Sequence, residues 1–217
     1  MSYKTIIGDA YYEFEEKRSV FIGYIKHIES EDEAKNFIEY INSKHYDSKH
    51  NVYGYIVGGD MLIQRYTDDG EPQGTAGIPI IELIKKRKLT DVIIVVTRYF
   101  GGILLGVGGL TRAYVNGANG AINNARIVDK VLGNEILIIV KYDLVGKLQY
   151  FFNENKIHIK DTLYEDRVIF KVRCEKIDVN KFLSDITDLT SNNLSVEISD
   201  DVMYFKDEGK YFLNNEV

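Results

Sequence analysis

The chain of 217 residues contains few residues of several types, and each shortage excludes a class of protein. Its single cysteine, Cys174, excludes an internal disulfide and a zinc site built from several cysteine ligands. Tryptophan is absent, and no apolar run approaches the roughly 18 residues that a membrane span requires. Residues 1–19 carry acidic side chains where a signal peptide has its apolar core, so we expect a cytoplasmic protein.

The chain also lacks the excess of positive charge that is typical of proteins that coat a nucleic-acid duplex. Its formal net charge is −6, and residues 1–130 hold 16 Lys and Arg against 17 Asp and Glu. The remaining residues hold 11 Lys and Arg against 16 Asp and Glu, so the negative charge is concentrated in the C-terminal part. A contact with nucleic acid would therefore have to come from a local basic patch in the first part.

Hydrophobic periodicity predicts an α+β domain in residues 1–130. Ser30 and Glu33 form a capping box at the start of one helix, and the apolar run that ends at Arg98 is typical of a central strand covered on both faces. Gly117 and Gly120 are expected to let a later helix lie close to the sheet. The predicted strands are 19–28, 51–57, 61–66 and 92–97, and the predicted helices are 30–41, 79–88 and 110–125.

Residues 135–205 predict a second domain with the order βαββαβ, which is the order of a ferredoxin-like sandwich. Asp143 and Asp178 are expected to cap its two helices. The domain boundary is expected near residues 129–134, and residues 206–217 are expected to form a tail. This second domain contains no group of residues that predicts chemistry.

The stretch TDDGEPQGTAG places Asp68, Asp69 and Glu71 in a loop with three glycines, between a predicted strand and a predicted helix. Converging carboxylates bind divalent metals or act as a general acid and base, but these three lie too close in sequence to complete a coordination sphere alone. The other interpretation is a turn in which an Asp side chain caps the Asp-Gly bend. Metal binding is the less favoured of the two.

A second stretch, GGILLGVGGLT, follows a predicted strand and leads into a predicted helix, where backbone N–H groups can bind an anion. It is neither a P-loop nor a dinucleotide fingerprint, since Thr111 stands at the third glycine position of the latter. Arg98 and Arg112 bracket it, and we expect their guanidinium groups to be solvated and to face one anionic partner. The alternative for the loop is a tight connection whose glycines permit positive φ. The alternative for the arginines is that Arg98 or Arg112 pairs internally with Asp69 or Glu71 and only holds the loop.

Catalytic candidates are otherwise lacking. The four histidines match no zinc signature, and only His50 lies near the two loops. No serine occupies a nucleophile elbow, and Cys174 lies in a predicted strand of the second domain. The sequence therefore predicts no catalytic residue, no bound metal and no cofactor.

The two blocks DDGEPQGTAGIP and VVTRYFGGILLGVGGLTRAY, in this order, resemble the IMPACT family and in particular its YigZ-like bacterial members. The segment KRSVFIGYI is similar to the family's opening strand. The resemblance covers roughly residues 17–126. One departure is Val52, where many members have a cysteine two residues after the histidine, which argues against a role for that cysteine.

The resemblance implies an N-terminal α+β domain similar to a fold of ribosomal proteins and elongation factor G, followed by a ferredoxin-like domain. Eukaryotic relatives regulate translation through a contact that uses an additional N-terminal domain, so that mechanism is not transferred to this chain. We expect a translation-linked binding protein whose partner is RNA, the ribosome or a translation protein. The alternative is a metal-dependent hydrolase of small molecules or phosphoesters that uses Asp68, Asp69 and Glu71. The predicted binding residues are His50, Asp69, Glu71, Arg98, Tyr99, Arg112 and Tyr114, with Gly101, Gly102, Gly106, Gly108 and Gly109 as an anion-binding loop.

Overall fold

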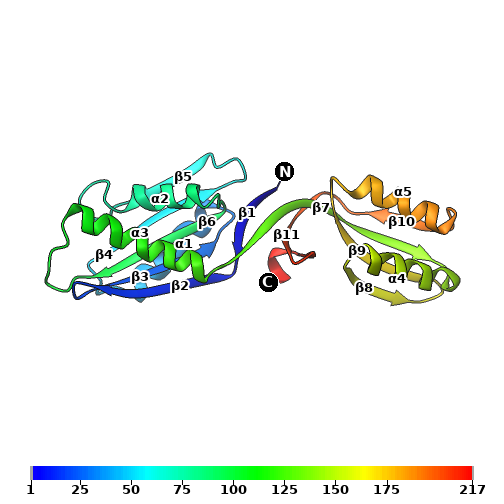
Figure 1. Cartoon of the computed structure of the whole chain (residues 1–217), viewed down its shortest axis with the longest axis horizontal. Coiled ribbons are helices and arrows are strands. Elements are labelled where there is room, and N and C mark those ends of the chain that lie inside the picture. Colours follow the sequence, from blue (N-terminus) through cyan, green and yellow to red (C-terminus); the bar gives the residue numbers. More distant parts are fainter. Residues whose placement is uncertain (1, 217) are drawn as a thin grey trace. The chain divides into compact units, whose positions relative to one another are not determined.

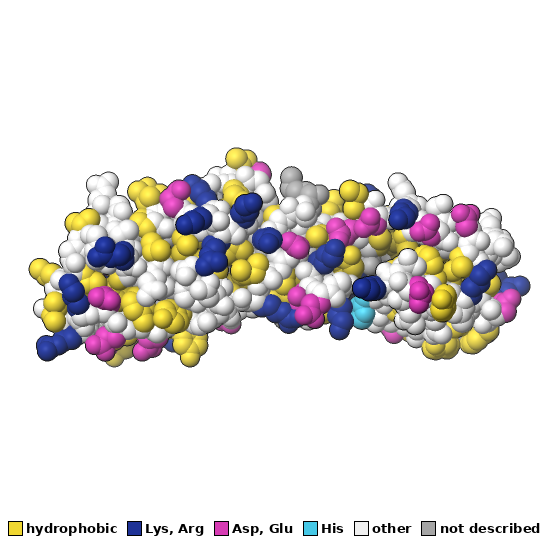
Figure 2. Space-filling model, viewed as in Figure 1, with side chains coloured by type: hydrophobic (Ala, Val, Ile, Leu, Met, Phe, Trp, Pro, Cys, Tyr) yellow, Lys and Arg dark blue, Asp and Glu magenta, His cyan; other side chains and the backbone are white. Residues whose placement is uncertain are grey.

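A computed structural model describes residues 2–216, which divide into two compact units, residues 3–129 and residues 130–216 with Ser2. Each unit is mixed α and β (Figure 1). None of the helices in the described residues is long and apolar enough to cross a bilayer. On the face seen in Figure 2, acidic and basic side chains are interspersed over both units.

The first unit is built on a five-stranded antiparallel sheet with the order β2-β3-β6-β4-β5. The short strand β1 (Ser2–Ile7) precedes it, and Lys4 forms an isolated parallel bridge with Leu89. The strands of the sheet are β2 (Asp9–Glu16), β3 (Ser19–His27), β4 (His50–Val57), β5 (Ile63–Thr67) and β6 (Val92–Tyr99), and the helices are α1 (Glu31–Lys44), α2 (Gly77–Lys86) and α3 (Val107–Asn124).

The central strand β6 is covered on both faces, as its continuous apolar sequence predicts. Val92, Ile94 and Val96 pack in one core with α2 and α3, which lie side by side (Figure 1). Ile93 and Val95 point to the opposite face and pack in a second core with α1. At the start of α1, the Ser30 hydroxyl accepts a hydrogen bond from Glu33 N, which confirms Ser30 as the cap. The Glu33 carboxylate accepts from Glu29 N and not from Ser30 N, so the capping box differs from the prediction in its second hydrogen bond.

Helix α3 lies close to the sheet because glycines occupy the contact. A Cβ on Gly23 of β3 would lie 2.2 Å from the carbonyl oxygen of Gly117 in α3, and a Cβ on Gly120 would lie 2.0 Å from the ring of Tyr12. Real Cβ atoms do not approach neighbours this closely. The predicted role of Gly117 and Gly120 is confirmed.

Replacing Gly23 by Ala is expected to lower the free energy of unfolding by at least about 1–3 kcal/mol, the usual cost of overpacking a filled interior. The added carbon would collide with backbone, which cannot swing aside as a flexible side chain can. Gly108→Ala is the matched control, because a Cβ there meets no atom of the described residues within 4 Å. Denaturant unfolding measures both variants, and equal stabilities would contradict the close approach of α3 to β3.

The second unit has the ferredoxin-like order β10-β7-β9-β8 in its sheet, with helices α4 and α5 packed on one face. Its elements are β7 (Arg126–Val140), which begins before the unit boundary, a 3₁₀ turn at Tyr142–Leu144, α4 (Val145–Glu154), β8 (Ile159–Tyr164), β9 (Val168–Glu175), α5 (Val179–Thr190) and β10 (Ser195–Ile198). The predicted fold class is confirmed.

The helix caps of the second unit differ from the prediction. Asp143 lies inside the 3₁₀ turn, and Leu144 is the N-cap of α4. Asp178 is the N-cap residue of α5 as expected, but in the described structure its carboxylate makes no cap hydrogen bond. Both acids therefore lie at the starts of helices, but in the described structure neither carboxylate makes the expected cap hydrogen bond.

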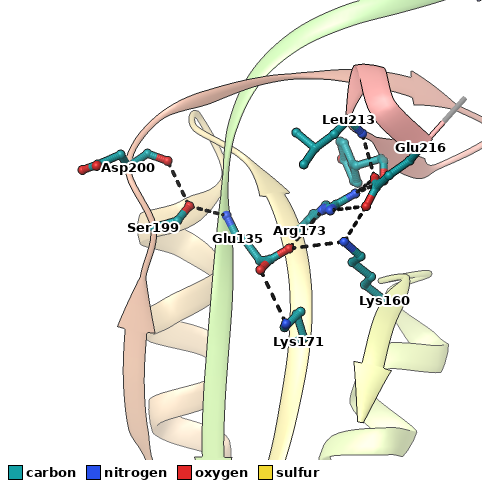
Figure 3. Close-up of polar contacts among 9 residues, drawn as sticks. Glu135, Lys160, Lys171, Arg173, Ser199, Asp200, Leu213 and Glu216 are labelled. Atoms are coloured by element: carbon teal, nitrogen blue, oxygen red, sulfur yellow. Dashed lines mark hydrogen bonds and ion pairs between the residues drawn. The ribbon is translucent and has the colours of Figure 1, made fainter.

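Residues 206–217, expected to be a tail, contain further regular structure. Strand β11 (Val202–Asp207) pairs with β7 and with β12 (Lys210–Phe212), and a 3₁₀ turn covers Asn214–Glu216. Buried Arg173 of β9 anchors this segment: its Nη1 and Nη2 lie 2.6 and 2.9 Å from the two carboxylate oxygens of Glu216 (Figure 3). Arg173 also donates to Tyr211 O and to Glu135, its direct neighbour across the sheet.

Candidate functional site

Asp68 fixes the path of the acidic loop between β5 and α2. Its Oδ1 accepts hydrogen bonds from Ala76 N and Gly77 N at 3.0 and 2.8 Å, and its Oδ2 accepts one from Gly74 N at 2.8 Å. These are the free N–H groups that precede and begin a helix, so the carboxylate acts as the cap of α2. Asp68 therefore caps a helix, and not the Asp-Gly bend that the sequence suggested.

Asp69 and His50 join the acidic loop to the start of β4. Asp69 Oδ2 accepts a hydrogen bond from Asn51 N at 2.6 Å, and the Asp69 carbonyl oxygen lies 2.5 Å from His50 Nδ1. Asp69 has a φ of 44°, in the left-handed region that Asp tolerates better than most residues. The Asp69 carboxylate is therefore engaged by the backbone of a neighbouring strand.

Glu71 brings three of the predicted residues together. Its Oε1 accepts hydrogen bonds from Arg98 Nη1 at 2.5 Å and from Tyr114 OH at 2.7 Å, and it lies 3.8 Å from His50 Nε2. These partners come from β6, α3 and β4, and we call Glu71, Arg98, Tyr114 and His50 the Glu71 cluster. Burial, with the Glu71 carboxylate beside it, raises the pKa of Tyr114, so Tyr114 remains a hydroxyl donor.

Arg98 is buried, with 5% of its surface exposed, and the expectation that it is solvated is wrong. Its guanidinium carbon lies 5.5 Å from the ring centre of Phe21 and 5.4 Å from that of Phe100. Arg112 is exposed and lines a different hollow, of about 270 Å³, with Glu16 and Lys17. The structure does not bring the two arginines to one anionic partner.

Tyr99 points away from this cluster, toward the face of the sheet that α1 covers. Its hydroxyl lies 2.8 Å from Nδ1 of His45, whose Nε2 lies 2.7 Å from Tyr24 OH. Burial lowers the pKa of His45, which keeps the ring neutral between two hydroxyl groups. His45 is thus a hydrogen-bonded core histidine.

The glycine loop between β6 and α3 turns apolar side chains outward. Gly101 N donates to Ser19 Oγ at 3.1 Å, which holds the loop against the start of β3, and Gly106 is the N-cap of α3 with a φ of 73°. We call the four exposed apolar residues of this segment the loop rim, and between 40 and 82% of their surface is exposed: Phe100, Ile103, Leu104 and Val107. Gly102 and Gly106 have positive φ, as the alternative of a tight connection predicts. Anion binding by the loop stays a prediction for Gly101, Gly102, Gly106, Gly108 and Gly109.

A pocket of about 410 Å³, which we call the loop pocket, lies between the loop rim and the Glu71 cluster. Its polar lining residues are Lys49, His50, Glu71 and Arg98, and the glycine loop and the first turns of α3 supply apolar lining residues. This volume falls in the range of about 300–1,000 Å³ that is usual for ligand pockets. Sequence reasoning missed the pocket, because it gave no role to the apolar residues between the glycines.

The acidic loop does not assemble a metal site. Within residues 2–216, no group of three or more His, Cys, Asp or Glu side chains is placed to hold a metal ion. Asp68 caps α2, Asp69 accepts from β4, and Glu71 accepts from Arg98 and Tyr114. The three carboxylates therefore serve three separate structural contacts.

Known proteins share this architecture. Residues 17–122 match the Impact N-terminal domain, and residues 138–193 match a domain of unknown function, DUF1949. The chain is 36% identical over 196 residues to the IMPACT family member YvyE of Bacillus subtilis (strain 168), covering 90% of each chain. It is 29% identical over 182 residues to the IMPACT family member YigZ of Escherichia coli (strain K12), covering 83% of this chain and 89% of YigZ.

A solved structure is also similar: the crystal structure of a hypothetical protein matches with a TM-score of 0.60 and 28% identity. The match covers 90% of this chain and 96% of that chain, so it includes both units. Sequence and structure thus agree over nearly the whole length. The chain belongs to the IMPACT family.

Proposed function

We propose that the chain is a translation-linked regulatory protein that acts by binding a protein component of the translation apparatus through the loop rim. The observation that carries the proposal is the exposure of four neighbouring apolar side chains, with Leu104 82% exposed. Exposed apolar groups that lie together above a pocket are typical of protein-binding surfaces. The loop pocket behind the rim gives such a surface a concave centre.

The link to translation rests on family membership. The resemblance implies that eukaryotic relatives regulate translation, and the matched segment, residues 17–122, contains the acidic loop, β6, the glycine loop and most of α3. The loop rim and the Glu71 cluster both lie inside that segment. A role in translation is therefore proposed for the first unit.

The choice of a protein partner over RNA follows from the burial of Arg98. Binding to a phosphate backbone requires accessible cations, and Arg98 is enclosed between two rings and paired with Glu71. Lys49 and Arg112 remain exposed, but they border different hollows. The loop rim instead exposes four neighbouring apolar side chains, which favours a protein partner.

The geometry of the acidic loop does not support the alternative function, a metal-dependent hydrolase. A general base or a metal ligand needs a carboxylate that is accessible to substrate or to the ion. Asp68 and Asp69 are each occupied by hydrogen bonds within the first unit, and Glu71 is paired with Arg98 and belongs to no group of three metal-binding side chains in the described residues. Binding remains the function that the geometry supports best.

The proposed function is tested by Leu104→Asp, which places a charge on the rim. We expect this variant to lose association with ribosomes and translation factors in co-sedimentation from cell extract, at low and at moderate salt, with or without ribonuclease. Leu62→Asp is the matched control, because Leu62 is 79% exposed in the same unit and lies outside the rim and the pocket lining. Association that ribonuclease abolishes, that falls steeply with salt and that ignores Leu104→Asp would instead indicate contact with RNA phosphates.

A further inference from the structure

The polar residues of the loop pocket are only partly satisfied. Glu71 Oε1 has three neighbours, but Glu71 Oε2 takes no hydrogen bond from any residue that the structure describes. Glu71 is 9% exposed, and its side chain lines the pocket. Oε2 is therefore exposed to the pocket, where it can accept a hydrogen bond from a ligand.

His50 lines the same pocket. Its Nδ1 lies 2.5 Å from the Asp69 carbonyl oxygen, which can only accept, so Nδ1 must carry a proton. Its Nε2 lies 3.8 Å from Glu71 Oε1, so the ring stands beside the carboxylate. The pocket therefore presents the Glu71 carboxylate as its acceptor.

Arg98 supplies hydrogen-bond donors beside this acceptor. Its Nη1 donates to Glu71, while its Nε is buried and has no partner among residues 2–216. A guanidinium has five N–H groups and no acceptor, so this one retains donors that a ligand oxygen can use. A ligand group that both donates and accepts would satisfy Glu71 and Arg98 together.

Charge and shape restrict the ligand further. The charges of Glu71 and Arg98 cancel, and Lys49 adds positive charge, which disfavours a lysine or arginine head group. A carboxylate would face the Glu71 carboxylate, which carries the same charge and cannot donate a hydrogen bond. Apolar walls and the ring of Phe100 suit a flat apolar body.

From these features we propose that the loop pocket receives a tyrosine side chain of the protein partner. The tyrosine hydroxyl would donate to Glu71 Oε2 and accept from Arg98, and its ring would lie against the apolar lining. This inference rests on the proposed function in that the partner is a protein. Tyrosine is also a residue that often dominates the binding energy of protein interfaces.

The test uses N-acetyl-tyrosinamide as the probe, with isotope-labelled full-length chain and NMR. We expect saturable shifts at Leu104, Val107 and the His50 ring. N-acetyl-phenylalaninamide and the O-methyl derivative of the tyrosine amide should bind more weakly by about threefold to tenfold, because each lacks the donated hydrogen bond. Equal affinities for the three amides, or no saturable shift near the pocket, would overturn the proposal.

Two variants keep the test decisive. Glu71→Gln should remove the preference for tyrosine over phenylalanine amide. Because this change also alters a buried ion pair, unfolding is measured alongside, and Leu104→Ser provides a second variant at an exposed position. Leu104→Ser should weaken the tyrosine amide severalfold while Leu62→Ser leaves it unchanged, and identical affinities for these two would contradict binding in the pocket.

The two proposals fail separately. If tyrosine amide binds in the pocket but Leu104→Asp leaves association with the translation apparatus intact, the pocket inference holds and the proposed function is wrong. If Leu104→Asp abolishes association and no amide binds, the rim is the docking surface and the tyrosine pocket is wrong.

Discussion

Replacing Arg98 by Met is expected to lower the free energy of unfolding of the first unit by about 3–5 kcal/mol, the usual cost of removing one partner of a buried ion pair. Glu71 would then remain buried as a carboxylate, with Tyr114 as its hydroxyl donor and His50 Nε2 at 3.8 Å. The substitution also removes the cation between the rings of Phe21 and Phe100. Denaturant unfolding at neutral pH measures the loss.

A double-mutant cycle separates the interaction energy of the Glu71 and Arg98 pair from the effects of the two single substitutions. Glu71→Gln and Arg98→Met should each destabilise strongly, while the double variant should be much less unstable than the sum, because no unpaired charge is left buried. Arg112→Met is the matched control, since Arg112 is exposed and surface changes usually stay within about 0.5 kcal/mol. If Arg98→Met behaves like Arg112→Met, the Glu71 and Arg98 pair does not stabilise the fold.

The core of each unit was predictable because its pattern is unambiguous. Residues 92–96 are apolar at every position, which is typical of a strand between two layers. Strand β2 (Asp9–Glu16) was missed because its glutamates were read only as evidence against a signal peptide. Its tyrosine and phenylalanine at alternate positions, Tyr12 and Phe14, pack on the core and were the available signal.

The candidate site was predicted as a set of residues but not as a set of contacts. In β6, side chains alternate between faces, so Arg98 follows Val96 toward α2 and α3 while Tyr99 follows Val95 toward α1. In α3, Arg112 and Tyr114 are two positions apart, which places them on nearly opposite sides of the helix. Both separations follow from periodicity alone, and applying it would have removed Tyr99 and Arg112 from the cluster.

The pairing of Glu71 with Arg98 was open from the sequence only as an alternative, in which Arg98 or Arg112 pairs with Asp69 or Glu71. The 27-residue separation of Glu71 and Arg98 crosses α2 and a change of direction, and only the packed fold decides which carboxylate of the loop reaches the arginine. Asp68, which that alternative did not include, and Asp69 both make other contacts. Asp68 accepts hydrogen bonds from N–H groups at the start of α2, whereas Asp69 accepts one from Asn51 N.

The C-terminal segment was missed for a related reason. Its partner, Arg173, lies 43 residues away in a strand whose polar positions resemble a solvent-facing side. The structure instead buries Arg173 under the segment that ends with Glu216 (Figure 3). A charged residue on the exposed face of a predicted strand gives no sign that a later segment covers it.

Glu216→Gln is expected to destabilise the second unit by about 2–3 kcal/mol at neutral pH, through weakened charge-assisted hydrogen bonds to Arg173. Glu135 still contacts Arg173 at 3.2 Å, and Glu216 is partly exposed, so the loss stays below that of Arg98→Met. Lys176→Gln is the control, because Lys176 pairs with Asp201 at a more exposed position. Thermal unfolding measures both variants.

The pH dependence gives this prediction a second readout. Hydrogen bonds from Arg173, with those from Leu213 N and Lys160, hold the pKa of Glu216 well below its usual value of 4.5. The folded state therefore binds fewer protons there than the unfolded state, so the stabilisation is complete above about pH 4.5 and is lost as the pH falls further. The difference in stability between the natural chain and Glu216→Gln should accordingly shrink from pH 6 to pH 3. A difference that stays constant over this range would show that Glu216 stabilises the segment by packing and not by its charge.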